Sequence, residues 1–133
     1  MRRISIGLIT ACLVAMLPGS AHAAVAAAGP GGFAAGFATP VVVVAKGESL
    51  TFANGDVAPH NVTAVDAFLS RKDAKKAKWC SAFDKGKCPL FWSPTITAGE
   101  QTEVEGLDRI EPGKQYAFIC TVHPNMKGTL VAR

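Results

Sequence analysis

Short segments of β-branched, aromatic and apolar residues, separated by turn residues, run through most of this chain. Each segment has three to six residues, which is too short for a stable helix but typical of a strand. Turn-forming residues lie between them, as in Asn54-Gly55-Asp56, Ala98-Gly99-Glu100 and Pro112-Gly113. The segments that predict strands are 41–44, 50–52, 61–65, 92–97, 101–104, 116–120 and 128–131. This spacing of strands and turns predicts an all-β sandwich.

One segment, residues 70–79, departs from this pattern because it is rich in Lys and Ala. These residues favour a helix over a strand, so we expect one short helix in a long inter-strand loop. Cys80 and Cys88 follow the segment, and a disulfide between them would stabilise the fold by about 2–3 kcal/mol. The sequence leaves open whether Cys120 pairs with one of them instead.

The amino-terminal segment has the features of an export signal. Arg2 and Arg3 form a basic start, an apolar run follows over 4–17, and Ala21-His22-Ala23 has the small residues of a cleavage site. A retained membrane anchor, or a lipid attached to Cys12, is the alternative for this segment. We expect three parts in the chain, which are a signal peptide at 1–23, a flexible Ala/Gly-rich leader at 24–36 and a single folded domain at 37–133.

Export would place the mature chain in the periplasm or outside the cell, where disulfides persist. After loss of Arg2 and Arg3, twelve Lys and Arg face ten acids, and a net charge of +2 does not indicate nucleic-acid binding. We expect a monomer with no stable membrane insertion. Three cysteines remain, and their odd number leaves one thiol without a disulfide partner.

The segment from Cys120 to Met126 carries three side chains that bind soft metals. His123 lies three residues after Cys120, and Met126 lies three residues further on. Thiolate, imidazole and thioether together favour copper over magnesium, calcium or manganese. After signal removal, the only other histidine is His60, at the start of a predicted strand. We therefore predict one type 1 copper ion held by His60, Cys120, His123 and Met126.

Other interpretations exist for each ligand taken alone. A buried cysteine often packs as a small apolar residue, and Met126 would also fit a core. Two histidines and a cysteine also suit zinc, but zinc would leave the methionine without a role. The four residues together favour copper.

The sequence resembles the cupredoxin family of blue-copper proteins, and most closely the plastocyanin, pseudoazurin and amicyanin group. The resemblance rests on the segments 52–56, 59–62, 112–120 and 127–131, and the short spacing from His123 to Met126 is similar to amicyanin. It implies a Greek-key β-sandwich and reversible one-electron transfer. It also implies that Met126 is the axial ligand and that the other three ligands are equatorial. The basic segment 71–87, with its cysteine pair, departs from compact members of the family.

Two neighbours of the ligands are expected to tune the site. The Asn61 side chain is placed to tie the two ligand loops together, and its backbone N–H is expected to reach the Cys120 sulfur. A plain turn-capping role is the alternative for Asn61. Pro124 has no N–H, so it removes one donor from the ligand loop.

Two surfaces are candidates for docking redox partners. In the family the loop histidine has an edge near the surface, and Val122, Pro124 and Pro59 would supply an apolar patch around it. The basic segment, with Lys75, Lys76 and Lys78, would guide an acidic protein partner, or would simply be a solvated face. We expect an electron carrier and not an enzyme, because copper oxidases and nitrite reductases need further copper sites. The alternative is a copper chaperone or scavenger that uses the same ligands.

Overall fold

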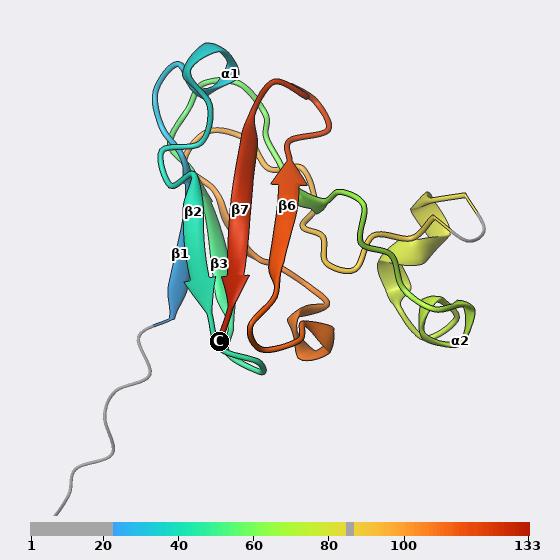
Figure 1. The fold of residues 1–133 in the computed structure, drawn as a ribbon. Coiled ribbons are helices and arrows are strands. Elements are labelled where there is room, and N and C mark those ends of the chain that lie inside the picture. Colours follow the sequence, from blue (N-terminus) through green and yellow to red (C-terminus); the bar gives the residue numbers. More distant parts are fainter. Residues whose placement is uncertain (1–22, 85–86) are drawn as a thin grey trace, which may run out of the picture.

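The computed structural model describes residues 23–84 and 87–133, and it forms two β-sheets packed face to face (Figure 1). The first sheet has the order β1-β3-β5, with β1 at Ala24–Ala28, β3 at Leu50–Asn54 and β5 at Gln101–Glu103. The second has the order β2-β7-β6-β4, with β2 at Val41–Val44, β7 at Lys127–Ala132, β6 at Gln115–Ile119 and β4 at Thr63–Ala64. β1 pairs with β3, and β2 with β7, in parallel, while the other pairs are antiparallel. The predicted β-sandwich is confirmed.

Alternation along the strands places the core between the two sheets. In β2, Val42 and Val44 are buried while Val41 and Val43 are exposed, because successive side chains of a strand point to opposite faces. Phe52 of β3 and Phe118 of β6 are fully buried, and Phe37 packs edge-on against both rings. Each such burial contributes about 1.5–3 kcal/mol, so these aromatic side chains hold the two sheets together.

The prediction of a flexible leader at 24–36 is wrong. Ala24–Ala28 forms β1, which pairs with the whole length of β3 from Leu50 to Asn54. Ala26 and Ala28 are buried, because alanine is small enough to let this strand cover the core closely. Backbone hydrogen bonds to β3 compensate for the small side-chain area. Residues 1–22 of the predicted signal peptide lie outside the described residues.

Residues 32–35 form a single helical turn, α1 (Gly32–Ala35), that follows β1. The turn begins after Gly31, whose φ of 73° lies in the left-handed region that glycine adopts without strain. Figure 1 shows α1 at the same end of the sandwich as the loop between β6 and β7. The segment expected to be flexible therefore covers one end of the fold.

The predicted strand at 92–97 is present only as isolated bridges. Trp92 bridges to Glu105 and to Thr63, and Ile96 bridges to His60. Pro94 has no N–H to give to a ladder, so a continuous strand cannot run through this position. The bridge between Ile96 and His60 nevertheless fixes the backbone next to a predicted ligand.

The long connection between β4 and β5 includes an excursion from the sandwich, residues 69–84 and 87–88, which stands beside the sheets as a small separate unit in Figure 1. It contains α2 (Arg71–Ala74) and the 3-10 helix η1 (Lys78–Ala82), so the predicted helix is shorter than 70–79. Ser70 caps α2 by accepting a hydrogen bond from the N–H of Asp73. A second 3-10 helix, η2 (Leu107–Arg109), follows β5. None of the helices in the described residues is both apolar enough and long enough to cross a membrane.

A disulfide joins Cys80 to Cys88, as expected, with 5.2 Å between the two Cα atoms. Cys88 is buried with Leu69 and Ala77 in a small apolar cluster, separate from the main core. The disulfide and this cluster together hold the excursion in place.

Replacing Cys80 and Cys88 by serine is expected to lower the free energy of unfolding by about 2–3 kcal/mol, because the unfolded chain has more conformational entropy without the cross-link. The visible spectrum of the copper-loaded protein should not change, since the excursion lies away from the ligand loops. Urea denaturation and an absorption spectrum of the same sample measure both effects. Bleaching of the copper band would contradict this separation.

Candidate metal centre

The loop between β6 and β7 holds three of the predicted ligands in a tight turn. The N–H of Cys120 donates to the carbonyl of Met126 at 3.1 Å, and the N–H of Met126 donates to the carbonyl of His123 at 2.9 Å. These bonds close the loop on itself just after β6 ends at Ile119 and before β7 begins at Lys127. The loop is therefore shaped by its own backbone.

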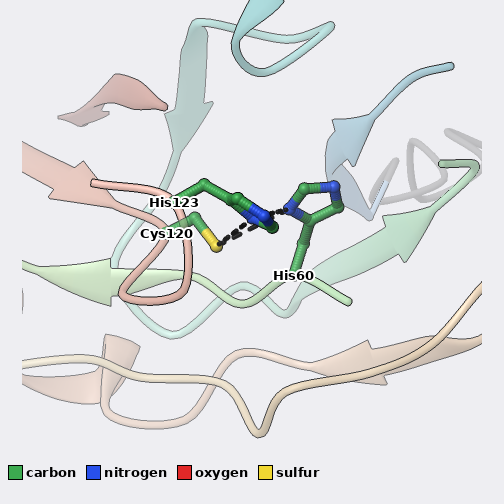
Figure 2. Close-up of side chains that lie close together, drawn as sticks. All are labelled: His60, Cys120 and His123. Atoms are coloured by element: carbon green, nitrogen blue, oxygen red, sulfur yellow. Dashed lines mark hydrogen bonds between the residues drawn. The ribbon is translucent and has the colours of Figure 1, made fainter. Parts of the chain in front are cut away.

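His60 reaches the same point from the segment between β3 and β4. Its backbone exchanges two hydrogen bonds with Ile96, of 3.1 and 2.9 Å, and its side chain is fully buried. Figure 2 shows the His60 ring turned toward Cys120 and His123. Two segments far apart in the sequence thus present their side chains to one position.

The donor atoms are spaced as a metal ion would need them. Cys120 Sγ lies 3.6 Å from His60 Nδ1 and 4.0 Å from His123 Nδ1, and the two Nδ1 atoms lie 3.2 Å apart. Metal bonds of about 2.0–2.1 Å to nitrogen and 2.3 Å to sulfur would place such donors roughly 3.3–3.8 Å apart. Among the described residues, these three form the one group of His, Cys, Asp and Glu side chains placed to hold a metal.

The remaining candidate ligand, Met126, is fully buried at the same end of the core. Its methyl group lies close to Gly32 of α1, where an added Cβ would come within 3.4 Å of Met126 Cε. Cys120 is buried and, within 23–84 and 87–133, is the one cysteine outside a disulfide. A thiol, two imidazoles and a thioether form the soft donor set that suits copper.

Asn61 joins the two ligand-bearing segments through its side chain. Its Nδ2 donates to Thr121 Oγ1 at 2.7 Å and to Thr95 Oγ1 at 2.9 Å, and its Oδ1 accepts from the N–H of Thr121 at 2.9 Å. The tie between the loops expected from the sequence is therefore present. In the part of the chain that the structure describes, the Asn61 N–H makes no hydrogen bond to the Cys120 sulfur. Pro124 is exposed in the ligand loop.

Asp56 is a buried neighbour of His60 that the sequence reasoning missed. Its Oδ2 lies 2.7 Å from His60 Nε2, on the side of the ring away from the other ligands, and its side chain is 1 % exposed. The pKa of Asp56 is lowered to about 2, chiefly by this hydrogen bond and further by backbone N–H donors, against the opposing effect of burial. The spacing of four residues from His60 is the signal that the sequence offers for this contact, although Asn54-Gly55-Asp56 by itself indicates only a turn.

Exposed apolar side chains lie on the surface next to His123. Val122 and Pro59 are exposed, as a docking role requires, and His123 itself is half-buried. Two further exposed apolar side chains lie at this end of the fold, Phe33 and Val57, which the sequence did not suggest. The Phe33 ring lies 6.2 Å from the His123 ring, between ring centroids.

Phe33 is held in place by the ligand loop. Asn125 donates a hydrogen bond from its side chain to the carbonyl of Phe33 at 2.8 Å. Lys75, Lys76 and Lys78 are exposed on the excursion, away from this apolar surface.

Comparison with known proteins agrees with this geometry. The sequence model described as copper binding proteins of the plastocyanin/azurin family matches residues 23–133. A search among curated protein sequences finds no significant match.

Among solved structures, a purple cupredoxin from Nitrosopumilus maritimus is similar, with a TM-score of 0.56 and 21% identity over 82% of this chain and 98% of that chain. A methionine variant of amicyanin in its Cu(I) form is also similar, with a TM-score of 0.53 and 23% identity over 82% of this chain and 80% of that chain. These likenesses concern the fold. With the matching family and a donor set suited to one type 1 copper ion, the chain belongs to the plastocyanin/azurin family of copper-binding proteins, the cupredoxins.

Proposed function

We propose that this protein carries single electrons between protein partners outside the cytoplasm, through one copper ion held by His60, Cys120, His123 and Met126. The observation that supports it is the convergence of three donor atoms at 3.2–4.0 Å, set by the protein itself. Bound copper supplies the change between Cu(I) and Cu(II). The chain contributes ligands that are fixed by the backbone of a tight loop and by the Asn61 tie. A fixed set of ligands lets both oxidation states use nearly the same geometry. Electron transfer is therefore not slowed by a large rearrangement of the ligands.

His123 is the proposed route for the electron. Its ring is half-buried beside Phe33 and next to Val122, so it brings the site close to an apolar surface. Apolar patches of this kind suit brief and weak docking. The basic excursion would add electrostatic guidance for a partner with an acidic surface.

A periplasmic or secreted location fits this role. The Cys80–Cys88 disulfide persists in an oxidising compartment, and the predicted signal peptide would deliver the chain there. Members of the family generally carry electrons and are not enzymes, and the proposal assigns no catalysed reaction to this chain.

A copper chaperone or scavenger is the second candidate, because the same ligands would hold an ion for delivery. Cyclic voltammetry and electron self-exchange of copper-loaded 24–133 separate the two functions. A carrier should cycle reversibly by one electron and keep its copper in the presence of a moderate chelator. If copper is lost to the chelator at a higher rate than electrons are exchanged, the result would favour the chaperone and contradict the carrier proposal.

Met126→Gln is expected to retain copper but to lower its reduction potential, because an amide oxygen is a harder donor than a thioether and favours Cu(II). A tenfold change in the Cu(II)-to-Cu(I) affinity ratio equals about 59 mV for a one-electron couple, and we expect at least this shift. Met126→Leu removes the donor altogether and should raise the potential. Shifts of the same sign in both variants, or loss of metal from both, would contradict a role for Met126 as a weak copper ligand.

A further inference from the structure

Four hydrogen-bonding groups converge on the Asp56 carboxylate. Oδ1 accepts from the backbone N–H groups of Val57 at 2.8 Å and Gly31 at 3.0 Å. Oδ2 accepts from the backbone N–H of Phe33 at 3.3 Å and lies 2.7 Å from His60 Nε2. The carboxylate therefore links a ligand histidine to the segment that carries α1.

The three backbone N–H groups that donate to Asp56 indicate which ring nitrogen of His60 carries the proton. A backbone N–H can only donate, so both oxygens of Asp56 are committed as acceptors. An ionised carboxylate has about four acceptor positions and no proton to give, and it meets all four partners at once. His60 Nε2 is then the fourth donor, which leaves the lone pair of a neutral His60 ring on Nδ1. Nδ1 is the atom that faces Cys120 Sγ at 3.6 Å and His123 Nδ1 at 3.2 Å.

We propose that Asp56 is a positioning residue of the copper site, which fixes the proton of His60 on Nε2 and, by its buried negative charge, favours Cu(II) over Cu(I). This inference depends on the copper site and not on the identity of any redox partner. It adds to the four ligands a fifth residue that sets the reduction potential.

The charge acts at short range in a poorly solvated place. Asp56 and His60 are both at most 1 % exposed, so water screens the carboxylate only weakly. With the Cys120 thiolate, the carboxylate brings the total charge of the site to zero around Cu(II) and to −1 around Cu(I). The oxidised state is therefore the one that this residue stabilises.

Asp56→Asn removes the charge with little change in volume, and Asp108→Asn is its matched control. Asp108 is 67% exposed and lies on η2, so its removal changes the net charge of the protein equally but at a solvated place. We expect Asp56→Asn to shift the Cu(II)-to-Cu(I) affinity ratio toward Cu(I) by tenfold or more, which is a rise of about 59 mV or more in the potential. Asp108→Asn should shift it by less than twofold. Equal potentials in the two variants would overturn the charge effect.

The tautomer of His60 is measured without any variant. In copper-free wild-type protein labelled with ¹⁵N, at a pH where the imidazoles are neutral, the His60 ring should show a protonated Nε2 and an unprotonated Nδ1. A predominant Nδ1–H form would overturn the positioning role.

In Asp56→Asn the NH2 of the new amide group would face a hydrogen-bond donor in either orientation, which could prevent folding. The tautomer measurement uses wild-type protein, so it decides the positioning role even if this variant does not fold. Asp56→Glu, which keeps the charge, should restore much of the wild-type potential. Failure of the carrier proposal would appear separately, as irreversible cycling of a wild-type protein whose His60 tautomer is still as expected.

Discussion

Cys120→Ala is expected to abolish the intense visible absorption of the copper-loaded protein and its reversible one-electron wave. The blue colour of a type 1 site comes from charge transfer between the cysteine sulfur and copper, so no other ligand can replace it. Cys120 is fully buried but small, and its loss should cost the copper-free fold only about 1 kcal/mol. Absorption spectroscopy after copper addition measures the colour, and far-UV circular dichroism measures the fold.

The double replacement of Cys80 and Cys88 by serine is the matched control, because it removes sulfur without touching the site. It should keep the visible band at full intensity. An unchanged band in Cys120→Ala would refute the assignment of the copper site. A Cys120→Ala protein that no longer folds would show that this residue acts mainly in the core.

Gly106→Ala is expected to have the largest effect on stability, about 3 kcal/mol or more out of the 5–15 kcal/mol typical of a small domain. Gly106 has a φ of 94°, where a side chain costs about 1–2 kcal/mol. An added Cβ would also overlap the backbone carbonyl oxygen of Leu90 and lie 3.1 Å from Phe91 Cα. Backbone atoms cannot move aside as a flexible side chain can, so the strain and the overlap add together. Urea denaturation of the copper-free protein measures the loss.

Gly99→Ala separates the two contributions. Gly99 has a similar φ of 79°, but an added Cβ there meets nothing within 4 Å. It should therefore lose only the conformational term of about 1–2 kcal/mol. Equal losses in the two variants would show that the close approach of Leu90 to Gly106 does not matter.

Much of the sandwich could be predicted because alternation along a strand is a local property. The segments at 41–44, 50–52 and 116–120 each carry their own buried and exposed faces, and the structure places a strand at each. β1 could not be predicted in this way, because its alanines carry little pattern. Its stability comes from the free edge of β3 and from the core that it covers, and both exist only after folding.

The candidate site divides in a similar way. Cys120, His123 and Met126 lie within seven residues, so a single loop brings them together and the sequence is enough to recognise them. His60 was predicted because no other histidine remained in the expected mature chain. Asp56 and Phe33 were not predicted, since the backbone N–H groups of Gly31 and Phe33 that hold the Asp56 carboxylate, and the contact of Asn125 with Phe33, depend on where α1 packs.

The sequence by itself determined the type and spacing of the candidate copper ligands in the loop between β6 and β7, because these ligands lie within a few consecutive residues. It also determined most of the strands, because a period of two residues needs no long-range information. The tertiary structure alone decided that α1 covers the end of the sandwich that carries the candidate copper ligands. It also decided which backbone groups hold the Asp56 carboxylate against His60 and which apolar side chains lie next to His123. The contacts that bring α1 to the site join residues 23 to 92 positions apart, and the sheets must first pack before such residues can meet.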